Sequence, residues 1–302
     1  MQVQRNVNAT QINQNAQHKL FVEGKDNQEI DPTVIKELLD NNNLTAVSIS
    51  TMGGCDNVRS AAQALMKEYP CYYFLIDRDD QDQVTVDKSW QSFPNPDEFN
   101  MLIWHKRELE NYFIDPDYIQ KSTYLKPEIN IRQRILDECN RWLFLDAANL
   151  TLYSISRELR KPLPIQHFRD RDEFRDQNAG RLKLESLSTD LDDRKISVTS
   201  VMEREVVNQR YVEFIQELSG GTMPLQYGVG SWLERMSGKE IFRTITNQCF
   251  EVRSLAVNLV TGKDKSKIIA KELTRLPLEE QPSDFQSLVN LLQNKVVRTP
   301  IL

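Results

Sequence analysis

Three acidic residues follow two apolar runs of the sequence, and together they could hold a metal ion. Residues 20–22 (LFV) lead into Glu23, and residues 71–76 (CYYFLI) lead into Asp77 and Asp79. A buried strand that ends in a carboxylate places it at the carboxyl edge of a sheet, where ligands of open α/β sheets bind. Carboxylates bind hard divalent cations, and a bound cation can support phosphodiester cleavage.

The spacing of these acids favours a common site. Alternate residues of an extended chain share a face, so Asp77 and Asp79 can point toward one spot. Two carboxylates held together repel each other unless a cation neutralises them. Gly24 permits a sharp turn directly after Glu23. The alternatives are a capping or surface role for Glu23 and a solvent-exposed turn for the aspartates.

Further candidates come later in the chain. Glu108 and Glu110 follow a fourth apolar run at 101–104, and Glu110 is the preferred ligand of a second metal ion. The two glutamates share a face if the chain is extended there and diverge if it is helical; alternatively, one of them pairs with a neighbouring basic residue. Lys239 lies in the segment SGKE and is either a catalytic group that stabilises charge on a phosphoryl transition state or a structural lysine. The segment is not a Walker A motif, because Glu240 follows the lysine.

The elements that position these residues alternate between strand and helix. Strands are expected at 19–23, 46–51, 71–77 and 101–104, with helices starting at Asp31-Pro32 and spanning 57–68. Such alternation predicts a mostly parallel sheet flanked by helices. Residues 80–100 are expected to be an exposed polar stretch. The expected division is a flexible polar tail (1–18), an α/β core (19–115), a large helical region (116–217) and an α/β and helical part that completes the core (218–302).

Composition narrows the functional classes. The chain has 302 residues, with 39% hydrophobic and 27% charged residues, which is typical of a globular protein. No apolar run approaches the roughly 20 residues of a membrane helix, and no signal peptide is recognisable, so a cytoplasmic location is expected. The four cysteines and three histidines are scattered, which disfavours zinc and favours oxygen ligands for magnesium or manganese. The net charge of -6 counts mildly against a nucleic-acid binder.

Three segments carry a resemblance to a known family. Residues 21–26 (FVEGKD), 74–79 (FLIDRD) and 107–112 (RELENY) resemble a TOPRIM domain in order and distance, above all that of the OLD-type nucleases. Residues 107–112, the helical middle and 237–240 (SGKE) are similar to the AriB effectors of the PARIS anti-phage defence system. The TOPRIM motifs cover about 19–115.

The resemblance implies a metal-dependent site. Glu23 would act as general base or metal ligand, Asp77 and Asp79 would bind Mg²⁺ or, as a substitute, Mn²⁺, and Glu110 would complete a second site. Asp26 and Glu108 are possible additional ligands. Because the chain has no Walker A motif, any ATPase must come from a separate subunit.

The expected function is a metal-dependent endonuclease that is the toxic effector of an anti-phage defence system. The resemblance implies that an ABC-type ATPase (AriA-like) holds it inactive until a phage-encoded trigger acts, and that the freed homodimer cleaves tRNA. The residues alone leave RNA and DNA open as substrates. The alternative is a non-catalytic metal-binding module that docks on such an ATPase. A primase- or topoisomerase-like enzyme ranks last, because no tyrosine stands out as a nucleophile.

Overall fold

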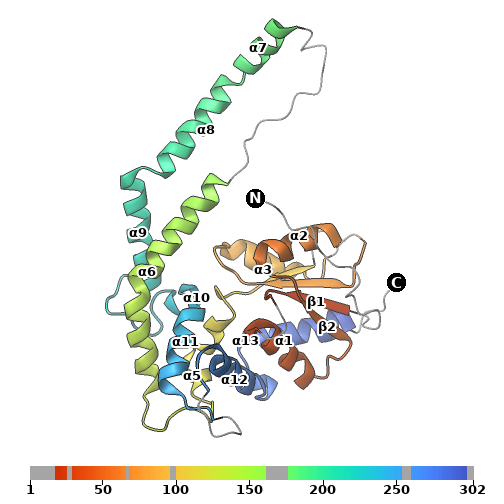
Figure 1. Cartoon of the computed structure of the whole chain (residues 1–302), viewed down its shortest axis with the longest axis vertical. Coiled ribbons are helices and arrows are strands. Elements are labelled where there is room, and N and C mark those ends of the chain that lie inside the picture. Colours follow the sequence, from red (N-terminus) through yellow and green to blue (C-terminus); the bar gives the residue numbers. More distant parts are fainter. Residues whose placement is uncertain are drawn as a thin grey trace. The chain divides into compact units, whose positions relative to one another are not determined.

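The chain forms two compact units. The computed structural model describes residues 18–25, 29–65, 68–95, 100–160, 176–253 and 260–297. One unit comprises Met1–Cys139 with Leu233–Leu302, and the other comprises Asn140–Trp232. These limits differ from the divisions after 115 and 217 that the sequence suggested. Residues 1–17 of the expected tail lie outside the described residues, and His18 already belongs to the first strand (Figure 1).

A parallel sheet of four strands lies at the centre of the first unit. Its strands are β1 (His18–Val22), β2 (Val47–Thr51), β3 (Tyr72–Ile76) and β4 (Met101–Ile103), in the order β2-β1-β3-β4. Every pairing is parallel, and Leu20 of β1 is in register with Ile49 and Tyr73. The prediction of an α/β fold with a mostly parallel sheet flanked by helices is therefore confirmed.

The connecting helices are α1 (Ile30–Asn41), α2 (Cys55–Leu65) and α3 (Gln83–Ser92). The sequence indicated only an exposed polar stretch at 80–100, and α3, which lies within it, was not predicted. Asp82 caps this helix by accepting a hydrogen bond from the Thr85 backbone N–H at 2.8 Å. Val86 is the one fully buried residue of α3, so the helix has almost no apolar stripe that its sequence could reveal.

Both faces of the sheet are covered. Phe21, Phe74 and Ile76 pack in one cluster with Val58 of α2 and Val86 of α3. Strand residues alternate between faces, so Leu20, Val22, Leu75 and Leu102, which are also buried, point to the other side. There α1 contacts the helices α12 (Gly262–Thr274) and α13 (Ser283–Leu291).

The C-terminal part of the first unit is helical where it is described. It contains α10 (Trp232–Arg235), α11 (Gly238–Cys249), α12, a short 3-10 helix (Leu278–Glu280), α13 and a π-helical turn (Leu292–Val297). The prediction of an additional α/β portion within 218–302 was wrong for the described residues, which form no strand and contain only isolated bridge residues at Phe250 and Arg253. Buried residues at helical spacing, such as Ile269, Ala270 and Leu273, explain the result.

The remaining helices run from the fourth strand into the second unit. They are α4 (Glu110–Phe113), α5 (Pro116–Ile119), α6 (Ile131–Leu159), α7 (Gln177–Glu185), α8 (Ser188–Val201) and α9 (Arg204–Ser219). Arg210 of α9 joins α6 through Ser154 at 2.8 Å and Glu158 at 2.9 Å. None of the described helices combines the length and apolar character needed to cross a bilayer.

Candidate functional site

The strand order places Glu23 and Asp77 at the point where the sheet topology reverses. From β1 the chain continues to β2 on one side, and from β3 it continues to β4 on the other. Ligands of open α/β sheets bind in the crevice at such a switch point, beyond the carboxyl ends of the strands. The two residues are in direct contact there, because Glu23 Oε1 accepts a hydrogen bond from the Asp77 backbone N–H at 2.9 Å.

A close approach of two loops fixes the backbone beside Glu23. Gly24 and Gly53 exchange backbone hydrogen bonds of 2.9 Å and 2.8 Å. Gly24 has φ +125°, a conformation that L side chains rarely adopt. A Cβ atom there would also lie 3.3 Å from Glu29 Oε2. The glycine therefore allows the sharp turn that the sequence indicated and holds Glu23 at the sheet edge.

Asp77 is the most fully engaged acid of the site. Its side chain is 3% exposed. Oδ1 accepts from the Leu109 backbone N–H at 3.0 Å, and Oδ2 accepts from Lys239 Nζ at 3.0 Å. The Lys239 backbone N–H in turn donates to Glu108 Oε2 at 2.8 Å. Three candidates that are far apart in the sequence, Asp77, Glu108 and Lys239, thus meet at one place.

A tight contact between α4 and α11 places Lys239. At Gly238, the residue before it, an added Cβ would lie only 2.5 Å from Asn111 Oδ1. The Asn111 amide donates to the carbonyl oxygens of Leu233 at 3.0 Å and Met236 at 2.9 Å. Only glycine fits against Asn111 at this point, and the contact sets the start of α11 beside Asp77.

Glu110 is buried with an unsatisfied oxygen. It is 3% exposed, and its Oε2 has no hydrogen-bond partner among the described residues. Burial raises the pKa of Glu110 to about 8, despite the opposing charge of Lys239. Burial and the neighbouring charge of Asp77 raise the pKa of Glu23 to about 7. Buried polar atoms are normally satisfied, so Glu110 Oε2 points to a binding partner that the protein does not itself provide.

Asp31 is a site residue that sequence reasoning missed. Its position before Pro32 indicates only the start of a helix, and it does lie in the first turn of α1. Burial, together with the charges of Asp77 and Glu110, raises its pKa well above the ordinary value. The overlooked signal is its position, because a helix that begins just after a site strand can bring its first turn back to the same sheet edge.

The remaining predicted ligands are Asp79, Glu108 and Asp26, and the structure places them differently. Asp79 has a left-handed backbone with φ 49°, and its N–H donates to the Arg107 carbonyl at 3.0 Å. Burial and the charge of Asp77 raise its pKa. The chain turns helical at Glu110, so Glu108 and Glu110 diverge: Glu108 bonds to Lys239, whereas Glu110 faces the cavity described next. Asp26 lies outside the described residues.

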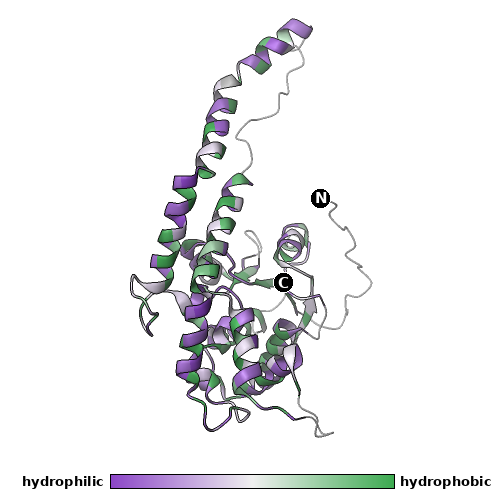
Figure 2. Cartoon of the chain, turned by 60° about the vertical axis from the view of Figure 1, so that its left-hand side comes forward, coloured by the Kyte–Doolittle hydropathy of each residue, from purple (hydrophilic) through white to green (hydrophobic). Residues whose placement is uncertain are grey.

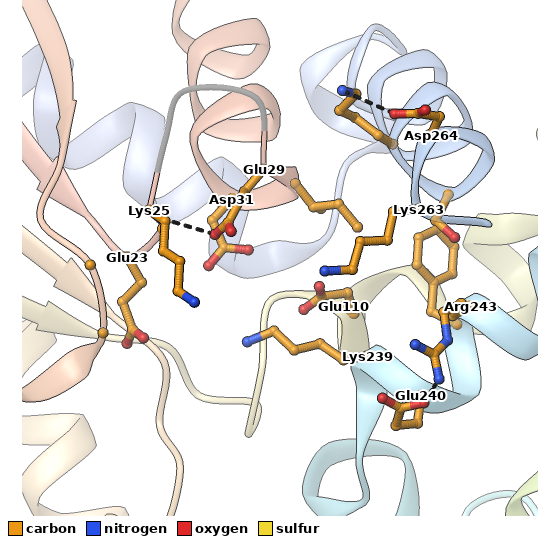
Figure 3. A pocket seen from close by; sticks show the side chains of 17 residues that line it. Glu23, Lys25, Glu29, Asp31, Glu110, Lys239, Glu240, Arg243, Lys263 and Asp264 are labelled. Carbon is orange, nitrogen blue, oxygen red and sulfur yellow. Dashed lines mark hydrogen bonds and ion pairs between the residues drawn. The ribbon is translucent and has the colours of Figure 1, made fainter.

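An open cavity of about 630 Å³ lies beside these acids. Its wall comes from the loop after β1, the first turn of α1, Gly53 and Gly54, and the first turns of α11 and α12. Figure 3 shows the side chains of Lys25, Lys239 and Lys263 reaching into the space around Glu110 and Asp31. The charged lining residues are Glu23, Lys25, Glu29, Asp31, Glu110, Lys239, Glu240, Arg243, Lys263, Asp264 and Lys267.

The donor atoms fit a hard cation, although the side chains are not arranged around one. Across the described ranges, no three His, Cys, Asp or Glu side chains lie close enough to hold an ion as they stand. The donors are carboxylate oxygens, which Mg²⁺ prefers, and Glu110 Oε2 lacks a partner. The Lys239 ammonium meanwhile neutralises Asp77; although burial opposes its charge, the surrounding carboxylates, Asp77 foremost, raise the pKa of Lys239.

Comparisons with protein-family models, with curated proteins and with solved structures find no match for this chain.

Proposed function

We propose that the chain is a metal-dependent endonuclease of TOPRIM-like type, which hydrolyses phosphodiester bonds of nucleic acid. The observation that carries the proposal is the meeting of Glu23, Asp77 and Lys239 at the switch point of the sheet, next to the unsatisfied Glu110 Oε2. Charged groups of both signs around one cavity suit a reaction in which a phosphate and a cation must be held together.

Each side chain has a distinct role in this proposal. A bound Mg²⁺ or Mn²⁺ would lower the pKa of water and stabilise charge on the leaving oxygen. Glu23, with a pKa of about 7, is suited to remove a proton from the attacking water near neutral pH. Asp77 and Glu110, with Asp79 close by, would hold the cation. The Lys239 ammonium would compensate charge that develops on the phosphoryl oxygens.

The expected biological setting rests on the sequence resemblance. The substrate would be tRNA, and the chain would be the toxic effector of an anti-phage defence system. An AriA-like ABC-type ATPase would hold the effector inactive, and a phage-encoded trigger would release it as a homodimer. A role as a toxic effector depends on nuclease activity, whereas the chain could be a nuclease without this role. The first experiment therefore tests the nuclease activity.

The test uses the purified full chain with labelled tRNA, single-stranded RNA and duplex DNA, in Mg²⁺, in Mn²⁺ and in EDTA. Cleavage should require the metal. Glu23→Gln should lower its rate by about 10²- to 10⁴-fold, the usual contribution of a general base. Lys36→Met is the matched surface control, since Lys36 is exposed on α1. Undiminished cleavage by Glu23→Gln, or cleavage that persists in EDTA, would refute the proposal.

A docking module is the second candidate function, and the surface of the second unit favours it. Many large apolar side chains of this unit are exposed, and Figure 2 shows apolar residues along its helices. Exposed apolar surface of this extent often marks an interaction site. The partner proposed for it is the ABC-type ATPase. The most exposed examples are Phe144, Leu145, Leu152, Tyr153, Leu182, Leu184, Ile196, Met202 and Met223.

The docking role predicts a defect that is separate from catalysis. The double variant Leu145→Glu with Leu152→Glu should lose association with an ABC-type ATPase encoded beside it, measured by the mass of the co-purified complex. Its intrinsic cleavage rate should remain that of the wild type. A complex of unchanged mass and stability would exclude this surface as the docking site.

A further inference from the structure

Lys25 and Lys263 are two cavity lysines whose ammonium groups have no charged partner among the described residues. Figure 3 shows them extending from different walls into the space around Glu110 and Asp31. Within the described part of the chain neither ammonium makes an ion pair or a hydrogen bond. Two other basic residues that line the cavity do have charged partners, because Arg243 pairs with Glu240 and Lys267 lies 3.5 Å from Asp264. Two positive charges are therefore available to a ligand.

The backbone of the cavity wall adds positive potential. The helices α1, α11 and α12, of 12, 12 and 13 residues, all begin at the cavity and contribute first-turn residues to its lining. The start of a helix carries unpaired N–H groups and a partial positive charge that favours phosphate. Lys263 lies in the first turn of α12, and Lys25 lies in the loop that leads to α1.

The cavity interior has the opposite charge. Glu23, Asp31 and Glu110 line it, and Glu110 Oε2 is buried with no hydrogen-bond partner in the part of the chain that the structure describes. A simple anion would be repelled by these carboxylates, and a simple cation would leave the two lysines unpaired. A phosphate that shares oxygens with a cation satisfies both sets of groups, because the carboxylates hold the cation and the ammonium groups contact the phosphate oxygens.

We propose that Lys25 and Lys263 clamp a single nucleic-acid strand, each contacting a backbone phosphate on a different side of the bond that is cut. This inference rests on the proposed nuclease function and assigns positions to its substrate. Lys239 is not part of the clamp, because it is bound to Asp77. Lys25 and Lys263 are positioning residues, so their loss should weaken strand binding more than it slows the chemical step.

Salt dependence of binding tests the clamp. Fluorescence anisotropy of a labelled single-stranded RNA would be followed with the full chain at several salt concentrations, with Ca²⁺ in place of Mg²⁺. Each phosphate contact with a single strand contributes about 0.7 to the slope of log K against log salt concentration. Lys25→Met and Lys263→Met should each reduce the slope by about 0.7, and the double variant by about 1.4. Lys36→Met, which removes the same charge outside the cavity, should leave the slope unchanged.

Removing the charge of single phosphates in the RNA tests which phosphate each lysine contacts. Methylphosphonate substitution of single phosphates on either side of the cut should weaken wild-type binding at two positions. Binding by Lys25→Met should not be weakened further by the substitution at one of these positions, and binding by Lys263→Met should not be weakened further at the other. In steady-state cleavage both variants should raise KM several-fold while kcat changes little. Because both side chains are exposed and unpartnered, melting temperatures equal to the wild type are expected and serve as the fold control.

The possible failures are distinguishable. If the wild type neither binds nor cleaves the strand, the proposed function fails and the clamp fails with it. If the wild type binds and cleaves while both lysine variants keep the wild-type slope, the clamp alone is refuted. It is also refuted if Lys36→Met reduces the slope as much as the cavity variants do, because the effect would then come from overall charge.

Discussion

At the residue scale, the site holds several carboxylates that burial and mutual repulsion keep close to protonation. Glu23 and Glu110 have pKa values raised to about 7 and about 8, and the pKa of Asp31 is raised well above its ordinary value. The Lys239 ammonium is bound directly to Asp77. Burial and repulsion therefore favour the protonated forms of Glu23, Asp31 and Glu110, and the divalent cation that we propose would compete with their protons.

The first prediction concerns pH. Glu110 ionises near its ordinary pKa in the unfolded chain but near 8 in the folded chain. The folded state therefore binds more protons between these values, and stability must fall as pH rises from about 4.5 to about 8. Glu110→Gln should remove part of this loss, on the order of 3 kcal/mol. Urea unfolding in EDTA at pH 5 and at pH 8 measures the free energy of unfolding of both proteins. A wild-type free energy of unfolding that does not change across this range would contradict the prediction.

The second prediction concerns metal addition. Mn²⁺ or Mg²⁺ at about 100 times its dissociation constant should stabilise the wild type by about 2.7 kcal/mol. At one fixed metal concentration the shift should be larger at pH 8 than at pH 6, because a bound cation competes with the protons on Glu23 and Glu110 and therefore binds more weakly at the lower pH. Glu110→Gln should show a reduced shift, and Lys36→Met the full one. Differential scanning fluorimetry gives the result, and equal shifts in both variants would remove Glu110 from the ligand set.

The sequence could reveal a site residue where local strand pattern determines its position, and could not where helix packing does. Glu23 and Asp77 were predictable because both follow apolar strands, and parallel strands bring their carboxyl ends to one edge. Glu110 could be named, but its divergence from Glu108 depends on a helical turn that the pattern left open. The places of Asp31 and Lys263 depend on how α1 and α12 pack, which no local spacing encodes.

At the scale of elements, α13 is tied to the loop between β4 and α4, which carries Glu108 and also leads into Glu110. Asp284 of α13 accepts hydrogen bonds from the Tyr112 hydroxyl and from the His105 backbone N–H at 3.3 Å. It also pairs with His105 Nδ1 at 3.0 Å. These contacts lower the pKa of Asp284 and, through its hydrogen bond, raise that of His105.

The third prediction follows from this link. Asp284→Asn should destabilise the protein by about 2 kcal/mol, because buried hydrogen bonds to a charged group are weakened. A His105 with a raised pKa stabilises the fold most below its ordinary pKa of 6.5 and loses that contribution as pH rises through the folded value. The penalty should therefore be larger at pH 6 than at pH 8. Asp264→Asn, in an exposed ion pair, is the control, and an equal penalty at both pH values would contradict the role of His105.

The elements themselves were predictable in proportion to their apolar content. The strands and α1 have continuous or periodic apolar residues, and they occur close to the expected positions. Helix α3 has one buried residue, and a polar helix of this kind resembles a loop in sequence. Lys239 could be noticed but not assigned a role, because its position beside Asp77 comes from the contact of Gly238 with Asn111.

At the scale of the whole molecule, the first unit is assembled from two distant stretches of the chain. Residues up to Cys139 supply the sheet, and residues from Leu233 supply α11, α12 and α13. Side chains from this second stretch are fully buried, among them Phe242, Ile269, Leu273, Phe285 and Leu288. The same stretch supplies Lys239, so the core and the site depend on one long-range association.

The last prediction is that residues 1–139 do not fold alone. Burial of one large apolar side chain stabilises a fold by about 1.5–3 kcal/mol. Losing Ile269, Leu273, Phe285 and Leu288 would then remove about 6–12 kcal/mol, comparable with the roughly 5–15 kcal/mol of total stability of a typical protein. Circular dichroism of the fragment should show no cooperative thermal transition, whereas the full chain should show one. A cooperative transition of the isolated fragment would mean that the sheet is stable without the C-terminal helices, and that Lys239 joins a site already formed.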